Sequence, residues 1–140
     1  MANTFEKVLI LKNISIFEDA SEMALSDLIA VAEEKTYKTG EDIIREGIEN
    51  TYLYIILSGS VHCTDKEGIV TELGARQYFG ETTVLCPAVI PYEIKANENT
   101  TLLRISGNRL YQMISLHPSI AHGFIGELSK RLRQGQLKNI

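Results

Sequence analysis

The sequence has little of what marks several large classes of protein. It contains two cysteines, three prolines and no tryptophan among its 140 residues. Two cysteines are too few for a disulfide scaffold, and Cys63 and Cys86 lie in no CxxC or Cys/His spacing of the kind that binds zinc. We therefore expect no metal site, and we interpret both cysteines as buried thiols of a protein in a reducing compartment.

Positive charge and long apolar runs are also lacking. The net charge is −4 and the pI is about 5.4, so no overall positive field would attract nucleic acid or anionic lipid. The apolar run Val8–Leu11 is far shorter than the ~20 residues of a membrane span, and no small-residue cleavage site follows it. These features predict a cytoplasmic protein with no nucleic-acid partner and no direct membrane insertion.

Catalytic patterns are missing as well. The three histidines, His62, His117 and His122, form no HxH pair followed by a spaced glutamate, which a metal-dependent barrel enzyme would need. No Ser/His/Asp set is recognisable either. We therefore predict that the chain has no catalytic residues and is not an enzyme.

The hydrophobic residues that are present follow a helical period at both ends of the chain. Within residues 1–33, Leu25, Leu28 and Ile29 share one helical face, and Ser21 is a plausible N-cap. Within residues 106–140, Pro118 suits the first turn of a last helix. The apolar stripe of that helix consists of Ile120, Phe124, Leu128 and Leu132.

Between these helices, residues 34–105 alternate with a period near two and contain frequent glycines, as in an antiparallel sandwich. The run Tyr52–Leu57 is almost wholly apolar or aromatic and predicts a central strand. The other expected strands cover residues 34–37, 42–45, 60–64, 69–73, 93–97 and 101–105. The order predicts one mainly β domain over residues 1–140, with helices on both sides of the β unit.

Three glycine-bearing blocks add a family resemblance that covers nearly the whole chain. They read KTGEDIIREG at residues 38–47, LYIILSGSV at residues 53–61 and LGARQYFGE at residues 73–81. In this order they resemble the cyclic nucleotide-binding domain shared by catabolite activators, kinase regulatory subunits and cyclic nucleotide-gated channels. The resemblance implies an antiparallel double-stranded β-helix, or jelly roll, with a phosphate-binding cassette at residues 79–92.

The resemblance also implies a ligand site in this cassette. In the family, the glutamate matching Glu81 accepts the ribose 2′-hydroxyl, and backbone N–H groups around Gly80 and at the start of a short helix face the cyclic phosphate. Glycine lets the backbone approach closely, and a helix start favours an anion. A purely structural role for Glu81 as a helix cap stays equally open. The candidate ligand-binding residues are Phe79, Gly80, Glu81, Thr82, Thr83, Ile90 and Tyr92.

The cassette departs from the family where it should hold the phosphate. Ile90 stands at the position of the family arginine and cannot pair with a phosphate, and Pro91 lacks the N–H group expected next to it. Glu93 adds a carboxylate nearby. Strand alternation gives no reason to aim Lys95 or Arg104 into the pocket as a replacement. We therefore expect cyclic AMP and cyclic GMP to bind weakly or not at all.

Two functions follow from this altered cassette. The first is a regulatory ligand-sensing module that has no cofactor other than a cyclic nucleotide or another small ligand. The second is a ligand-free interaction or dimerisation domain, in which the apolar residues Val84, Val89 and Ile90 fill the pocket or bind a partner. The opening EKVLILK at residues 6–12 resembles the start of such domains in larger bacterial proteins, including membrane transporters of nucleotides. A homodimer and a larger parent protein are both expected partners.

Overall fold

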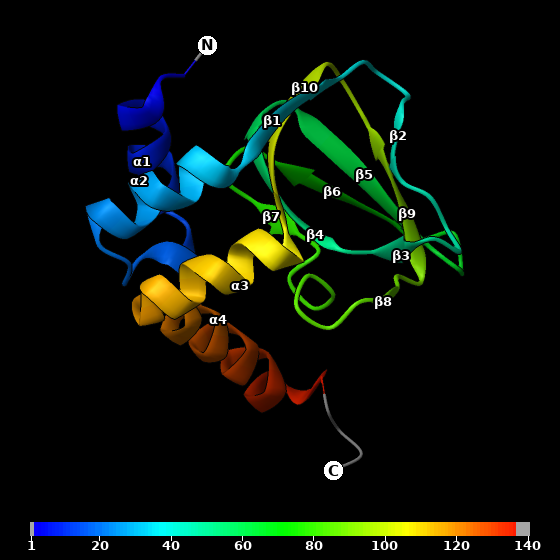
Figure 1. Cartoon of the computed structure of the whole chain (residues 1–140). Coiled ribbons are helices and arrows are strands. Elements are labelled where there is room, and N and C mark those ends of the chain that lie inside the picture. The colour runs from blue at the N-terminus through cyan, green and yellow to red at the C-terminus, as the bar shows by residue number, and fades with distance from the viewer. Residues whose placement is uncertain (1, 137–140) are drawn as a thin grey trace. The chain divides into compact units, whose positions relative to one another are not determined.

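The computed structural model describes residues 2–136, and these form two compact units (Figure 1). One unit, which we call the helical unit, comprises Met1–Ala30 and Gln112–Ile140, and the other, the β unit, comprises Val31–Tyr111. Within the described range, no helix combines the length and the apolar character needed to cross a membrane. The organisation of residues 1–140 as one domain stays a prediction.

The helical unit is built from short helices that meet at the 3-10 helix η1 (Ser15–Phe17). The Phe17 and Phe124 rings meet edge to face, with centroids 6.1 Å apart. As expected, the Ser21 hydroxyl accepts a hydrogen bond from the Ala24 N–H at 3.1 Å, and Pro118 lies in the first turn of the last helix. The other elements are α1 (Thr4–Lys12), α2 (Glu22–Val31), α4 (Pro118–Arg131) and η2 (Leu132–Gln136), and α3 (Gly107–Leu116) begins in the β unit.

The β unit contains two four-stranded antiparallel sheets and a two-stranded pair. The first sheet has the order β1-β10-β4-β7, the second has the order β2-β9-β5-β6, and β3 pairs with β8. The strands are β1 (Glu33–Tyr37), β2 (Asp42–Ile44), β3 (Glu49–Asn50), β4 (Tyr52–Ser58), β5 (Ser60–Asp65), β6 (Val70–Gly74), β7 (Tyr78–Phe79), β8 (Ala88–Val89), β9 (Tyr92–Ala96) and β10 (Thr100–Ser106).

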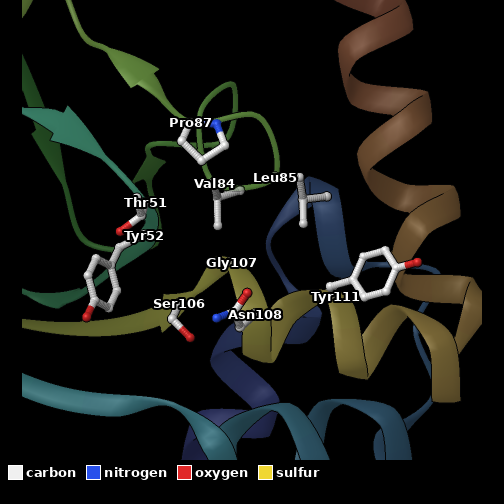
Figure 2. Close-up of a pocket in the computed structure, with 9 residues that line it drawn as sticks. All are labelled: Thr51, Tyr52, Val84, Leu85, Pro87, Ser106, Gly107, Asn108 and Tyr111. Atoms are coloured by element: carbon white, nitrogen blue, oxygen red, sulfur yellow. The ribbon is translucent and has the colours of Figure 1, made fainter.

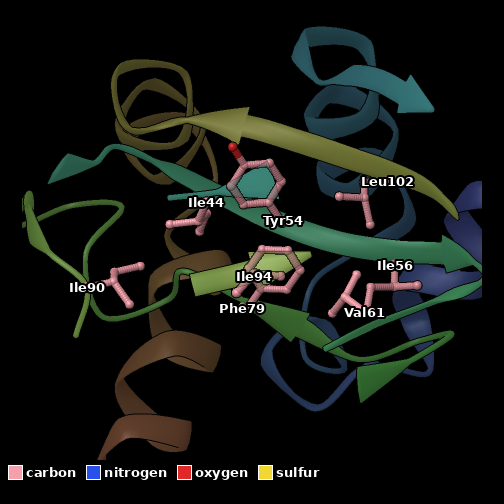
Figure 3. Close-up of a cluster of buried hydrophobic side chains, with 8 residues drawn as sticks. All are labelled: Ile44, Tyr54, Ile56, Val61, Phe79, Ile90, Ile94 and Leu102. Atoms are coloured by element: carbon pink, nitrogen blue, oxygen red, sulfur yellow. The ribbon is translucent and has the colours of Figure 1, made fainter. Parts of the chain in front are cut away.

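The hydrophobic core of the β unit draws on both four-stranded sheets, which makes it a sandwich (Figure 3). Its period-two strands turn alternate side chains to this core, as the sequence pattern predicts. The first sheet supplies Tyr54, Ile56, Phe79 and Leu102, and the second supplies Ile44, Val61 and Ile94. Ile90, which follows β8, completes the cluster.

The sequence predictions of the mainly β fold with flanking helices and of a central strand at residues 52–57 are confirmed, since β4 lies between β10 and β7. The very short strands β3, β7 and β8 were not predicted, because two residues show no periodicity. The interpretation of both cysteines as buried is wrong: Cys63 is half-buried and Cys86 is exposed. Cys86 lies in the loop before β8, where no sheet face covers it.

Candidate functional site

The cassette turns sharply at Gly80, whose φ of +88° is a conformation that favours glycine. The N–H groups of Thr83 and Val84 donate to the Gly80 carbonyl at 3.2 and 3.0 Å and close a single turn. The short helix that the resemblance implies after Gly80 is absent here, because residues 81–83 form only this turn. A helix N-terminus therefore does not supply the anion site in this structure.

A buried amide holds the cassette turn in place. Asn50 on β3 donates through Nδ2 to the Tyr52 carbonyl at 2.8 Å and to Thr83 Oγ1 at 2.9 Å. The Thr83 hydroxyl in turn donates to the Gly80 carbonyl at 3.4 Å. Thr83 is thus engaged inside the protein. Sequence reasoning missed Asn50, since a lone asparagine between Glu49 and Thr51 carries no distinctive pattern.

Three of the candidate ligand-binding residues belong to the hydrophobic core. Phe79 stacks on Tyr54, with ring centroids 4.8 Å apart. Ile90 is only 2% exposed and belongs to the buried cluster (Figure 3). Tyr92 packs against the same cluster. The Ile90 side chain therefore points into the core of the sandwich.

Two candidates remain, Glu81 and Thr82, of which Glu81 contributes negative charge within the cassette. Glu81 is half-buried, whereas its neighbour Thr82 is exposed. Burial raises the pKa of the Cys63 thiol, and the charges of Asp65 and Glu81 raise it further. Glu81 and Cys63 therefore lie close enough for the carboxylate charge to act on the thiol.

Arg104 lies on the inner face of the first sheet, which corrects the expectation from strand alternation. It pairs across the strands with Tyr54 on one side and Glu33 on the other, and directly opposed residues share a sheet face. Its guanidinium stands 4.5 Å from the centre of the Tyr52 ring and contacts the Glu33 carboxylate at 3.3 and 3.4 Å. Lys95, by contrast, is exposed and lies 3.8 Å from Asp42.

This arrangement shifts the pKa values of Tyr54 and Arg104. Burial raises the pKa of Tyr54 to about 12, with a smaller contribution from Tyr37, although Arg104 opposes the shift. Burial lowers the pKa of Arg104, but its hydrogen bond to Glu33 and the charge of that carboxylate outweigh this effect, so the net shift is upward. Arg104 is therefore a fixed cation that is already engaged by a carboxylate.

A cavity of about 390 Å³ opens beside this cluster, between β2, β3 and β4. Tyr52, Tyr54 and Asn50 line its inner wall, and Asp42, Arg45 and Glu49 add charged groups. Neither Phe79 nor Glu81 nor Ile90 lines this cavity. The structure thus brings Tyr52, Tyr54 and Arg104 together. Alternation along β4 could have indicated that Tyr52 and Tyr54 share a face, but not that Arg104 of β10 joins them.

The fold and the cassette define a ligand-sensing β-sandwich of the regulatory type. The sequence profile described as "Cyclic nucleotide-binding domain" matches residues 34–117, which is more than half of the chain. The chain belongs to the cyclic nucleotide-binding domain family. Domains of this family bind small regulatory ligands and occur within larger proteins.

Relatives and solved structures agree with this assignment. The chain is 27% identical over 131 residues to the potassium channel KAT2 of Arabidopsis thaliana, covering 91% of this chain and 19% of the channel. It is 30% identical over 132 residues to a cGMP-dependent protein kinase of Eimeria tenella, covering 94% of this chain and 13% of the kinase. The chain therefore spans less than a fifth of the length of these relatives. The catabolite activator protein of Thermus thermophilus superposes with a TM-score of 0.78 at 25% identity, covering 89% of this chain and 61% of that one.

Proposed function

We propose that this chain is a regulatory ligand-sensing module that binds cyclic AMP and cyclic GMP weakly or not at all. The observation that carries the proposal is the burial of Ile90 in the sandwich core, at the position where the family has its phosphate-binding arginine. An apolar, buried side chain at that position supplies neither charge nor hydrogen bonds to a cyclic phosphate.

The energetic argument compares Ile90 with the arginine it replaces. A charge-assisted hydrogen bond contributes about 1.5–3 kcal/mol, so its loss lowers affinity by about ten- to a hundredfold. Pro91 removes one further donor, because proline has no backbone N–H. Glu93, two residues after Pro91, adds a carboxylate near the expected phosphate. All three effects act against an anionic ligand.

Arg104 does not compensate for the missing arginine in this proposal. Its guanidinium is already engaged by the Glu33 carboxylate and the Tyr52 ring. A phosphate would have to compete with that carboxylate for the same donors, and a charge-assisted pair of this kind is costly to break once it is partly buried.

The test is calorimetry with cyclic AMP and cyclic GMP on the unaltered chain and on the double variant Ile90→Arg/Pro91→Ala. We expect the double variant, which regains a cation and an N–H group, to bind at least about tenfold more tightly. The matched control is Ile90→Ala/Pro91→Ala, which opens the same space without adding charge and should gain nothing comparable.

Two results would contradict this proposal. One is low-micromolar or tighter binding of either nucleotide to the unaltered chain. The other is an absence of any gain in a double variant whose NMR spectrum shows that it is folded, which would mean that the alignment of Ile90 with the family arginine is wrong.

A second candidate function is association through α4. Ile125 and Leu132 are 63% and 49% exposed, and with the half-buried Leu128 they follow the i, i+3, i+7 spacing of one helical face. Such a face is available to a second copy of the chain or to another part of a parent protein. In either case we propose a non-catalytic role in the cytoplasm, within a larger protein such as a channel or transporter.

A further inference from the structure

A second cavity of the β unit lies between the cassette residues Val84, Leu85 and Pro87 and the start of α3 (Figure 2). Its volume is about 470 Å³, within the range of small-molecule sites. Figure 2 shows Val84 and Leu85 on one side of the cavity, with Asn108 and Tyr111 facing them from α3. The other lining residues are Thr51, Tyr52, Pro87, Ser106 and Gly107.

The backbone around this cavity is held by a close approach that only glycine permits. The Gly107 N–H donates to the Thr51 carbonyl at 3.0 Å. A Cβ atom placed on Gly107 would lie 2.2 Å from the Val84 carbonyl oxygen, so any side chain there would separate α3 from the cassette segment. This contact fixes the distance between the cassette segment at Val84 and the start of α3, which are far apart in the sequence.

The lining has a distinct chemistry. It contains no carboxylate, ammonium or guanidinium group, and its polar groups are all neutral: the hydroxyls of Thr51 and Ser106, the amide of Asn108 and the phenols of Tyr52 and Tyr111. Ser106 Oγ accepts the Arg109 N–H at 3.3 Å, which leaves the Ser106 hydroxyl proton available as a donor. Leu85 and Tyr111 add apolar and aromatic surface that is 46% and 67% exposed.

We propose that this cavity binds a small uncharged molecule that has an aromatic ring and an amide or hydroxyl group. The ring packs between Leu85 and Tyr111, where it covers apolar surface that water otherwise contacts. The polar group hydrogen-bonds with Ser106 and Asn108. Because no charged side chain is present, a charged analogue would lose its hydration without gaining a partner. The site shares Val84, Leu85 and Pro87 with the cassette, but the candidate ligand-binding residues Phe79, Glu81 and Ile90 do not line it.

The test uses three probes of the same shape and different charge: benzamide, benzoate and benzylamine. Each is titrated into ¹⁵N-labelled protein, and backbone amide shifts are followed by NMR. We expect benzamide to bind most tightly and to shift the amides of Thr51, Leu85, Gly107 and Asn108. Benzoate and benzylamine should each bind at least about tenfold more weakly.

Two variants locate the site, and a third provides the control. Asn108→Phe fills the cavity from an exposed position and should abolish the benzamide shifts. Leu85→Ala removes part of the apolar wall and should weaken binding about fivefold. Lys66→Phe adds the same aromatic side chain in the exposed turn between β5 and β6 and should change nothing.

Each alternative result overturns the proposal. Equal or tighter binding of benzoate or benzylamine would contradict the neutral chemistry of the site. Benzamide shifts that persist in both Asn108→Phe and Leu85→Ala, or that spread evenly over the surface, would place the probe elsewhere. If Asn108→Phe is unfolded by its NMR spectrum, Leu85→Ala alone decides, and an unchanged affinity rejects the site.

Discussion

Gly80 meets two separate requirements at a single residue of the cassette. Its φ is +88°, and a Cβ atom built on it would lie 2.3 Å from the Tyr52 carbonyl oxygen and 2.9 Å from Asn50 Nδ2. The first requirement concerns backbone strain and the second concerns space. Both belong to the folded state, so Gly80 is needed for the structure whether or not a ligand binds.

The first prediction follows from this geometry. Gly80→Ala should lower the free energy of unfolding by at least about 2 kcal/mol, because the strained φ and the clash with Tyr52 add. Urea denaturation measures the change. Gly74→Ala is the matched control, since a Cβ there meets nothing within 4 Å, and it should alter stability by less than about 0.5 kcal/mol. Similar effects of the two substitutions would contradict the prediction.

Tyr54 provides a second prediction at this scale, through its pKa. In the unfolded chain the phenol titrates near its ordinary value of 10, whereas burial raises the pKa of Tyr54 to about 12 in the folded protein. Below pH 10 the phenol keeps its proton in both the folded and the unfolded state, and the full stabilising contribution of the raised pKa is present. Between pH 10 and 12 only the unfolded state loses the proton, so stability falls as pH rises, by about 2–3 kcal/mol in total.

Comparison of the unaltered chain with Tyr54→Phe isolates this effect. Denaturation midpoints measured from pH 8 to pH 12 should fall more steeply in the unaltered chain than in Tyr54→Phe. Cys63 and the tyrosines that do not interact with Tyr54 are common to both proteins, so their titrations cancel in the difference. Parallel pH profiles for the two proteins would show that the Tyr54 phenol is not shielded from water as its burial indicates.

At the scale of elements, α4 contains two glycines in opposite surroundings. A Cβ on Gly123 would lie 2.0 Å from the Ile16 carbonyl oxygen in η1, whereas a Cβ on Gly126 would meet nothing within 4 Å. The lack of a side chain at Gly123 therefore allows α4 to pack closely against η1. The same packing brings the rings of Phe17 and Phe124 together.

The third prediction is that alanine substitutions at Gly123 and Gly126 change the free energy of unfolding in opposite directions. Gly123→Ala should destabilise the protein by about 3 kcal/mol, because α4 must move away from the η1 backbone. Gly126→Ala should stabilise it by about 0.5–1 kcal/mol, because glycine is a poor helix former. Thermal unfolding of the two variants measures both changes. A loss of stability in Gly126→Ala would mean that its side of α4 is covered in solution.

Comparison of the expected and observed strands shows which elements a sequence pattern can predict. Strands of five or more residues were predictable because their period of two extends over several side chains, as in β4. The two-residue strands β3, β7 and β8 carry no such signal and exist because the longer strands position them. The cassette motif at Phe79–Glu81 was recognisable, but its local shape was not. Its single turn depends on Asn50, a residue distant in the sequence.

For the candidate site, the strand register determines which side chains face the core, and sequence reasoning could not predict this for every residue. The alignment of Ile90 with the family arginine stays a prediction from the sequence, whereas the burial of Ile90 depends on both sheets. The inward placement of Arg104 was missed, because it requires the pairing of β10 with both β1 and β4. A side chain's partners across a sheet depend on residues far away in the chain, and periodicity within one strand does not contain them.

At the scale of the whole molecule, the apolar residues in and just after α4 separate into two groups with different roles. Ile120 and Phe124 are buried and belong to the core of the helical unit. Ile125 and Leu132 are exposed, with Leu128 between them half-buried. A substitution at Phe124 would therefore test folding, because its ring packs against Phe17. Only the exposed residues are suitable for testing association.

The last prediction is that the chain self-associates through this exposed part of α4. Sedimentation velocity at micromolar concentrations should show a dimer for the unaltered chain, because burial of Ile125 and Leu132 in an interface removes apolar surface from water. Ile125→Asp and Leu132→Asp should each shift the protein towards monomer, since a buried, unpaired carboxylate is costly. Leu116→Asp, the same kind of change at an exposed leucine of α3, should leave the dimer intact. A monomer at all concentrations, or a dimer that both α4 variants retain, would remove α4 as an interface between copies and leave the regulatory module as the better supported function.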